Sequence, residues 1–332
     1  MRLPDRRLIT FALASMAAAL LALTGPAKAQ EAPFPAVFRV EDIKVRDVTL
    51  HVRIGGSGPA VVLVHGFGES GDMWSPLAVR LMRDHTVIVP DLRGMGRSSK
   101  PEGGFSKFSQ ADDIAALMDR LHVARSDLVA HDIGNMVAFA FAEKYADRVA
   151  KLVVIDAPIP GVGPWDEIVK SPATWHFRFG GADVERLVKG RERIYLDRFW
   201  NEFSKDPASF TEPSRQHYAT LYALPGAMHA AFEQYRAFDQ DAEDNRAWRL
   251  GHGKLAMPVL ALGAEAGLGQ QMGEIMRTTA TDVTAAVIPN CGHWIMQENP
   301  AATIQLVVAF LEKPDLALPN VDKDREANKL GA

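Results

Sequence analysis

From Val45 onward the chain alternates short apolar runs, rich in β-branched residues, with longer segments of helical spacing. Gly, Pro or Asp bounds these runs, as is typical of strands buried in a sheet. The clearest predicted strands are 60–64, 86–89, 127–130, 152–155, 259–262 and 284–288, and the clearest predicted helices are 74–82, 112–121, 135–145 and 302–311. This alternation predicts an α/β fold with a doubly wound, mostly parallel sheet.

The alternation is interrupted at residues 161–250, where no strand-like run occurs and aromatic residues cluster among helical segments. We interpret this stretch as a helical cap inserted into a core that comprises residues 30–160 and 251–315. The last residues, 316–332, combine Pro, Asp, Lys and Asn without periodicity. This composition predicts a flexible, solvated tail.

The first 29 residues have the pattern of an export signal. Basic residues precede a charge-free apolar run at 8–23, and Ala-Lys-Ala at 27–29 supplies a small-x-small cleavage pattern. The run of 16 residues is shorter than the roughly 18 or more apolar residues of a membrane-spanning helix. We therefore expect removal of residues 1–29, a periplasmic or secreted protein, and no stable membrane insertion. The Arg6-Arg7 pair leaves both the Sec and the twin-arginine routes open.

The composition is that of a globular protein and excludes several classes of site. Of the 332 residues 47% are hydrophobic, and the formal net charge of −4 gives no basic footprint for nucleic acid. The single cysteine, Cys291, forms neither an intrachain disulfide nor a Cys-rich zinc site. The glycine-rich turn at 91–98 has neither dinucleotide nor P-loop spacing. We therefore expect no nucleic-acid partner, no metal and no cofactor.

The sharpest local motif is Leu-Val-Ala-His-Asp-Ile-Gly at residues 128–134, where a predicted strand runs into a predicted helix. Small residues at Ala130 and Gly134 permit a strained turn that lifts the central side chain, Asp132, above the edge of the sheet. Taken alone, the motif fits a nucleophile and a helix-capping aspartate about equally well.

Further segments follow in the order expected around such a nucleophile. The loop after the strand at 60–64 carries Phe67, whose amide together with that of Ile133 forms a candidate oxyanion hole. His293 lies on a loop after the last strand and is the candidate general base. Two carboxylates that follow strands, Asp156 and Glu265, are candidates to orient His293.

An aspartate in the nucleophile position indicates a particular chemistry. A carboxylate with an ordinary pKa of about 3.9 is ionised at neutral pH and attacks a saturated carbon without a base. The product would be an alkyl ester of Asp132, which water activated by His293 would then hydrolyse. The sequence therefore favours strained or activated C–O or C–halogen bonds as the target.

Together these motifs resemble the α/β-hydrolase family. Within that family they resemble the branch of epoxide hydrolases and dehalogenases in which the nucleophile on the strand-to-helix turn is Asp. The most similar group is the Cif type of secreted bacterial epoxide hydrolases. The resemblance extends over nearly all of the predicted mature chain and is carried by residues 131–134, 156–160, 175–177, 232–237 and 291–294. It implies an α/β-hydrolase fold, a covalent intermediate and the ability to form a homodimer.

The resemblance also implies roles for particular residues. It favours Asp156 over Glu265 as the acid that orients the base. It places the donors to the epoxide oxygen at His176 and Tyr235 in the predicted cap, because ring opening produces an alkoxide that needs acidic N–H or O–H groups. Packing within the cap is the alternative role for both side chains.

Hydrolysis of a small-molecule epoxide to a vicinal diol is the leading hypothesis. Haloalkane-converting relatives carry a Trp directly after the nucleophile, where this sequence has Ile133. The haloacetate branch carries arginines there, whereas this sequence has no Arg between Asp132 and Arg148. Haloalkane or haloacid dehalogenation by Asp132 is the alternative. A non-catalytic binding module on a hydrolase fold is the second alternative, and the presence of nucleophile, base, acid and oxyanion positions argues against it.

Overall fold

The computed structural model describes residues 34–312, and the predicted export signal at 1–29 and tail at 316–332 lie outside the described residues. Within the described range, eight strands form one sheet in the order β1-β2-β4-β3-β5-β6-β7-β8. They are β1 (Arg39–Val45), β2 (Val48–Gly56), β3 (Ala60–Val64), β4 (Thr86–Pro90), β5 (Ser126–His131), β6 (Val149–Ile155), β7 (Val259–Ala264) and β8 (Val283–Ile288). Strand β2 pairs antiparallel with β1 and β4, and the other neighbours pair in parallel.

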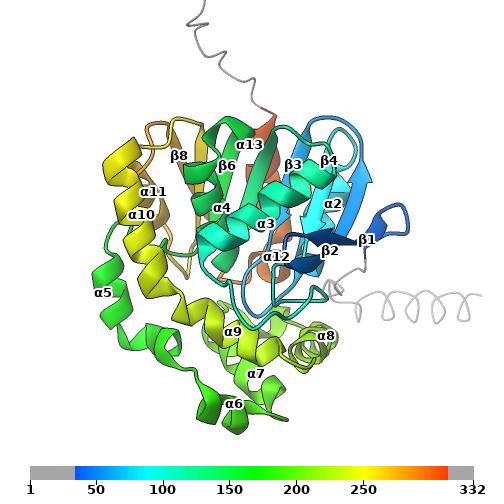
Figure 1. Cartoon of the computed structure of the whole chain (residues 1–332), viewed down its shortest axis with the longest axis vertical. Helices are drawn as coiled ribbons and strands as arrows, with labels where there is room; N and C mark the ends of the chain where they lie inside the picture. Colours follow the sequence, from blue (N-terminus) through cyan, green and yellow to red (C-terminus); the bar gives the residue numbers. More distant parts are fainter. Residues whose placement is uncertain (1–33, 313–332) are drawn as a thin grey trace, which may run out of the picture.

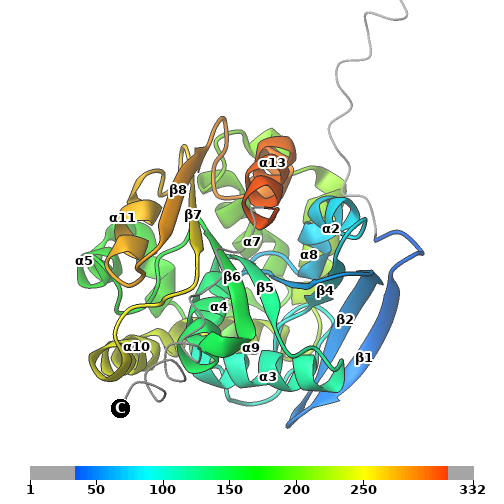
Figure 2. The same ribbon diagram turned by 90° about the horizontal axis from the view of Figure 1, so that it is seen from above.

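Helices cover both faces of the sheet (Figure 2). One face carries α3 (Lys107–Arg120), α4 (Ile133–Lys144) and α11 (Gln271–Arg277), and the other carries α2 (Ser75–Leu81), α12 (Ile295–Glu298) and α13 (Pro300–Leu311). Because successive side chains of a strand point to opposite faces, Val62 and Val64 of β3 join the first apolar core, and Val61 and Leu63 join the second. Burial on both faces explains the continuous apolar runs of the sequence.

The predicted α/β fold with a mostly parallel, doubly wound sheet is confirmed. Each predicted strand and helix corresponds to an element of the structure, with ends that differ by a few residues. The sequence pattern does not single out β1 and β2, because polar residues alternate with apolar ones along these two antiparallel strands at one side of the sheet. It also misses α11 and α12, which have only 7 and 4 residues.

Between β6 and β7 the chain folds into helices, most of which lie together beyond one end of the sheet, below it in Figure 1, while the last of them runs back up beside the sheet. They are α5 (Trp165–Lys170), α6 (Ala182–Val188), α7 (Glu192–Glu202), α8 (Glu212–Tyr222), α9 (Ala227–Arg236) and α10 (Phe238–His252), with the 3-10 turns η3 (Pro172–Arg178) and η4 (Pro207–Ser209). The start of α8 follows from its sequence, because the Thr211 side chain accepts the Ser214 N–H and a proline occupies the first turn. We call α5–α10 the cap.

Buried polar contacts attach the cap to the core. Asp241 of α10 accepts a hydrogen bond from the Lys107 amide at 2.7 Å, and it lies 3.1 Å from the Lys107 Nζ atom. Gln110 donates to Gln234 of α9 at 2.7 Å. Since buried polar groups are costly without partners, these contacts define how α9 and α10 sit on α3.

Two kinds of feature are missing from the part of the chain that the structure describes. No helix within residues 34–312 is both long and apolar enough to cross a bilayer. The same residues contain no group of three or more His, Cys, Asp or Glu side chains arranged to hold a metal ion.

Candidate active site

The turn between β5 and α4 holds Asp132 in a strained backbone conformation. Its φ of 53° and ψ of −125° lie outside the regions that residues with side chains ordinarily adopt. A Cβ atom on Gly134 would lie 2.3 Å from the Val64 carbonyl oxygen, and one on Gly66 would lie 2.3 Å from the Asp132 Cβ atom. Close approach of backbone segments therefore requires glycine at both positions.

The Asp132 side chain does not cap α4, although the residue occupies the N-cap position. Its Oδ1 atom accepts a hydrogen bond from the Phe67 amide at 2.7 Å, and its Oδ2 atom lies 3.5 Å from His293 Nε2. Burial opposes ionisation, but the hydrogen bond and charge of His293 hold the pKa of Asp132 below its ordinary value. The side chain is 20% exposed, so an ionised carboxylate is accessible to a small molecule.

Of the two predicted oxyanion residues, one contacts this carboxylate and the other follows Asp132 in the chain. Phe67, on the loop after β3, donates the hydrogen bond to Oδ1. Ile133 is the first residue of α4, where amide groups have no partner within the helix and the helix dipole favours negative charge. His65 holds the same loop in place, since its Nδ1 donates to the Gly66 carbonyl and its Nε2 accepts from the Leu92 amide.

His293 lies between two carboxylates. Its Nδ1 atom is 3.1 Å from Asp156 Oδ2. Asp156 follows β6 with a φ of 50°, and its Oδ1 atom accepts the Ala264 and Leu268 amides, each at 2.8 Å. Burial lowers the pKa of His293, but the hydrogen bonds and charges of Asp132 and Asp156 outweigh burial and raise the pKa to about 10. His293 is therefore protonated at neutral pH while Asp132 is ionised.

Glu265, the other candidate acid, points away from His293. It follows β7 directly, and its half-exposed carboxylate accepts hydrogen bonds from Lys205 Nζ and from the Asn290 amide. The hydrogen bond from Lys205 keeps the pKa of Glu265 below its ordinary value. Of the two candidates, the structure brings Asp156 to the base.

The two predicted cap donors meet beside the oxyanion loop. His176 lies in η3 and Tyr235 in α9, and their ring centroids are 5.3 Å apart. The Tyr235 ring also packs against Phe67 at a centroid distance of 5.2 Å. Burial lowers the pKa of His176 to about 4, and burial together with the charge of Asp132 raises that of Tyr235. Both side chains are therefore uncharged donors at neutral pH.

Two further buried side chains near the site are not singled out by the sequence. The His131 ring lies 4.5 Å from that of His293 and donates from Nε2 to the His293 carbonyl at 2.9 Å. Tyr195 of α7 lies 6.4 Å from the Phe67 ring, and its buried hydroxyl has no hydrogen-bond partner among residues 34–312. The i, i+4 spacing of Tyr195 and Phe199 marks one helix face and is the signal that points to Tyr195.

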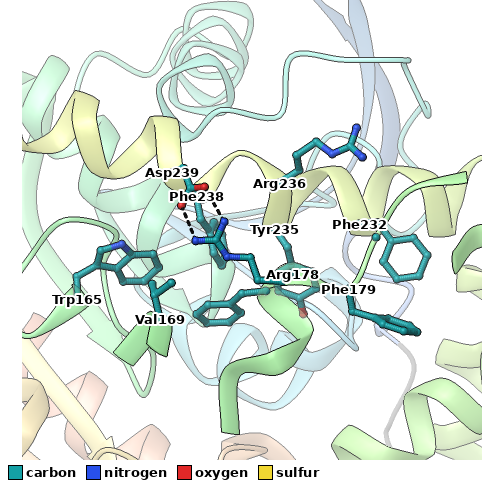
Figure 3. A pocket seen from close by; sticks show the side chains of 11 residues that line it. Trp165, Val169, Arg178, Phe179, Phe232, Tyr235, Arg236, Phe238 and Asp239 are labelled. Atoms are coloured by element: carbon teal, nitrogen blue, oxygen red, sulfur yellow. Dashed lines mark hydrogen bonds and ion pairs between the residues drawn. The ribbon is translucent and has the colours of Figure 1, made fainter. Parts of the chain in front are cut away.

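A cavity of about 160 Å³ lies between η3, α9 and α10, and Tyr235 forms part of its wall (Figure 3). Aromatic side chains supply much of the remaining wall: Trp165, Phe177, Phe179, Phe232 and Phe238. Arg178 donates two hydrogen bonds to Asp239, at 2.8 and 3.2 Å, which Figure 3 shows as dashed lines. Arg236, the third charged residue of the lining, lies 3.0 Å from Glu233, so each charge on this cavity has a partner. The volume is close to that of an apolar cavity that takes up benzene.

Comparison with known proteins agrees with this architecture, since a family model of the alpha/beta hydrolase fold matches residues 59–300. The chain belongs to the α/β-hydrolase family. The hydrolase is 30% identical to a soluble epoxide hydrolase of Corynebacterium sp. (strain C12) over 269 residues, which are 79% of this chain and 93% of the relative.

The hydrolase is also 30% identical to a fluoroacetate dehalogenase of Burkholderia sp. over 287 residues, which are 81% of this chain and 92% of the relative. Among solved structures, Cfl2 from Burkholderia cenocepacia superposes with a TM-score of 0.76 at 33% identity and covers 86% of this chain and 97% of its own. The hydrolase is thus related to both epoxide hydrolases and dehalogenases, as its motifs predict.

Proposed function

We propose that the hydrolase opens epoxides to vicinal diols through an ester of Asp132. The observation that carries this proposal is the combination of an ionised nucleophile in the core with two uncharged donors, His176 and Tyr235, in the cap. A halide leaves as a stable anion, whereas an epoxide oxygen needs a proton as the ring opens. Neutral donors beside the nucleophile therefore favour an epoxide.

In the first step, Oδ2 of Asp132 attacks a ring carbon, because Oδ1 is held by the Phe67 amide. A bond forms between Oδ2 and carbon, and the ring C–O bond breaks with its electron pair on oxygen. That oxygen takes a proton from Tyr235, while the neutral His176 ring donates a hydrogen bond to it. The product is a β-hydroxyalkyl ester of Asp132.

In the second step, His293 becomes the base. Esterification removes the negative charge of Asp132, which lowers the pKa of His293 and releases the proton that restores the cap donor. His293 then takes a proton from water, whose oxygen attacks Asp132 Cγ, and the negative charge appears on Oδ1 beside the Phe67 and Ile133 amides. The oxyanion then collapses and the Cγ–Oδ2 bond breaks, and the departing alkoxide takes the proton that His293 holds, which completes the diol. The Asp132 carboxyl, which keeps the oxygen of water, returns its own proton to His293.

The cavity beside Tyr235 supports a substrate with an apolar substituent. Its aromatic walls and volume of about 160 Å³ suit a group of about the size of a phenyl ring. The Arg178–Asp239 and Arg236–Glu233 pairs leave no unpaired charge there for an ionic substituent. Aryl epoxides are therefore the class that this cavity favours.

Haloalkane dehalogenation is the second candidate function, and the indole of Trp175 favours it. Its Nε1 atom is buried without a hydrogen-bond partner within residues 34–312, so it can donate to a departing halide. A haloacid substrate has less support, because Ile133 and Met136 occupy the first turn of α4 where the haloacetate branch carries arginines.

We also place the hydrolase in the Cif-type group of exported bacterial epoxide hydrolases, on the motifs at 131–134, 175–177 and 232–237. Removal of residues 1–29 and assembly as a homodimer belong to this placement. Sequencing the N-terminus of protein recovered from the periplasm or the medium tests the removal of residues 1–29. Light scattering of the purified protein tests whether it forms a homodimer.

A panel of aryl epoxides, alkyl epoxides and haloalkanes, assayed with the wild type and with Asp132→Ser, tests the function. We expect diols from epoxides with the wild type and none with the variant. A single turnover in oxygen-18 water should label Asp132, while the diol gains the unlabelled Oδ2. Release of bromide without epoxide turnover would establish the dehalogenase instead, and binding without any turnover would establish the non-catalytic module.

A further inference from the structure

Two cap residues form hydrogen bonds with Gly68, which follows Phe67 on the oxyanion loop after β3. The Gly68 amide donates to the Tyr222 hydroxyl oxygen at 2.8 Å, and its carbonyl accepts from Trp200 Nε1 at 3.2 Å. Both hydrogen bonds are buried. Trp200 lies in α7 and Tyr222 is the last residue of α8, so the cap satisfies both backbone polar groups of a core residue.

Gly68 has little freedom to leave this position. Its φ of +79° lies in the left-handed region that favours glycine, and a Cβ atom there would lie 2.7 Å from the Trp294 ring. Trp294 follows the base, His293. The loop that carries Phe67 is therefore confined between the cap and the segment that carries the base.

The carboxyl end of α7, near Trp200, also forms hydrogen bonds with the segment that carries His293. The Phe203 carbonyl accepts the His293 amide at 2.8 Å, and the Phe199 carbonyl accepts Trp294 Nε1 at 3.2 Å. The Phe203 carbonyl lies just past the carboxyl end of α7, where carbonyl groups lack partners within the helix, and the Phe199 carbonyl accepts the Phe203 amide as well as the indole. A Cβ atom on Gly292 would lie 2.5 Å from the Phe203 carbonyl oxygen, so the two segments approach as closely as glycine permits.

Phe67 connects these contacts to the nucleophile. Its amide donates to Asp132 Oδ1 at 2.7 Å, while its ring packs against Phe199 and Tyr222 at centroid distances of 5.1 and 5.4 Å. The peptide unit that follows Phe67 is the one held by Tyr222. A change in the Gly68 peptide therefore changes the direction in which the Phe67 amide points.

We propose that Tyr222 and Trp200 are positioning residues for the second half-reaction, which they support by aiming the Phe67 amide at Oδ1. The inference rests on the proposed function. In alkylation the amide stabilises the reactant carboxylate, so it contributes nothing to the rate. In ester hydrolysis Oδ1 changes from a carbonyl oxygen to an oxyanion, so the amide hydrogen bond strengthens in the transition state. Loosening the amide slows hydrolysis and spares alkylation.

The test measures both half-reactions of the full chain by rapid quench with styrene oxide, an aryl epoxide, and mass spectrometry of the Asp132 peptide. Tyr222→Phe removes one oxygen atom and keeps the ring. Removing an oxyanion donor outright costs about 10²–10³-fold, so misdirecting one should slow ester hydrolysis by about 10- to 100-fold. Alkylation should stay within about 3-fold of the wild type, and the ester should accumulate.

Trp200→Phe provides a second variant, because it removes the indole N–H and retains an aromatic ring beside Phe210. It should shift the two rates in the same direction as Tyr222→Phe. Tyr145→Phe is the matched control, since its hydroxyl donates to Asp112 at the end of α4 remote from Asp132. Circular dichroism and thermal unfolding establish that each variant is folded.

The outcomes separate the inference from the function on which it rests. If the wild type forms the ester and the folded variants hydrolyse it at the wild-type rate, or lose both rates equally, the positioning role is wrong and the epoxide hydrolase stands. If the wild type forms no ester with the epoxide, both proposals fail. Accumulated ester in Tyr222→Phe and Trp200→Phe, but not in Tyr145→Phe, supports the positioning role.

Discussion

The core and the cap place their functional side chains by different physical means. In the core, Asp132 and Asp156 follow strands with φ values of 53° and 50°, and backbone amides hold an oxygen of each carboxylate. In the cap, His176 and Tyr235 are buried among aromatic rings. Backbone dipoles stabilise charge, whereas aromatic burial suppresses it. The core is therefore suited to the charged reactants and the cap to uncharged proton donors.

Two histidines make this contrast explicit. Burial acts on both and lowers the pKa of each, but His293 has two carboxylate neighbours and His176 has none within hydrogen-bonding distance among the described residues. The pKa of His293 is consequently raised to about 10 and that of His176 is lowered to about 4. The carboxylate neighbours of each ring, which its position in the fold provides, determine which histidine carries a proton.

The largest effect is expected in the core, from His293→Gln. Ester formation should continue, because Asp132 needs no base to attack. Ester hydrolysis should slow by about 10²–10⁴-fold, the usual contribution of general base catalysis. Mass spectrometry should find the covalent adduct on Asp132. Loss of ester formation together with hydrolysis would contradict the assignment of ester formation to Asp132 alone and of ester hydrolysis to His293.

The next largest effect should distinguish the two core carboxylates. Asp156→Asn removes the charge beside His293 Nδ1 and should reduce kcat by about 10²-fold, within the range for general base catalysis. Glu265→Gln is the matched control, because Glu265 bonds to Lys205 and Asn290 at the surface, and its kcat should stay within about 2-fold of the wild type. The reverse ranking in steady-state kinetics would overturn the assignment of Asp156.

In the cap, Tyr235→Phe should slow epoxide opening by about 10- to 100-fold, since it removes the proton donor and leaves only the hydrogen bond from His176. The ester should not accumulate, in contrast to His293→Gln. A bromoalkane of similar size provides the control, because halide departure needs no proton. Equal loss with both substrates in single-turnover assays would assign Tyr235 to packing.

The pKa contrast predicts stability changes of opposite sign. The pKa of His293 is raised above its unfolded value of 6.5 to about 10, so its stabilisation is complete below pH 6.5 and is lost as the pH rises toward 10. The pKa of His176 is lowered to about 4, so stability falls as the pH drops from 6.5 to 4.

Accordingly, His293→Gln should lower the free energy of unfolding by about 1–2 kcal/mol more at pH 6 than at pH 10. His176→Phe should make the protein relatively more stable at pH 4 than at pH 7, by a similar amount. Urea denaturation at these pH values measures both differences. Shifts of the same sign would mean that both histidines share one electrostatic environment.

The smallest effect concerns the cavity of the cap. Val169→Trp fills part of the space beside Trp165 and Phe177 and should lower kcat/KM for styrene oxide by about 3- to 10-fold, a loss of about 1 kcal/mol of contact. The value for propylene oxide should change by less than about 2-fold. Equal loss for both epoxides would place the aryl group elsewhere.

The core site could be read from the sequence because its geometry follows from local rules. Parallel strands end at one edge of a sheet, so residues on the loops that follow strands, such as Asp132, Asp156 and His293, are brought together. Their position in the sequence does not distinguish Asp156 from Glu265 as the partner of His293, because both directly follow strands. It depends on which way one side chain turns: the Ala264 and Leu268 amides hold the Asp156 carboxylate, and the absence of a Cβ atom on Gly267 leaves room for it.

The cap site could not be derived in the same way. The helical character of 161–250 is visible in the sequence, but the packing of α5–α10 is set by aromatic contacts between residues far apart in the chain. His176 and Tyr235 were identified through a resemblance, and no local pattern indicates that Tyr222 and Trp200 reach Gly68. Long-range contacts of this kind have no signature in spacing or composition.

Cys291 has a practical consequence for experiments on the motion of the cap. This single cysteine is fully buried, its thiol donates to the Gly292 carbonyl, and burial raises its pKa, so it reacts slowly with maleimides. Dyes can therefore be attached at Ile194→Cys of α7 and Val40→Cys of β1, which are 70% and 53% exposed in the native chain, without first replacing Cys291. Energy transfer between the dyes during turnover would then measure whether the distance between cap and core changes in an otherwise unaltered enzyme.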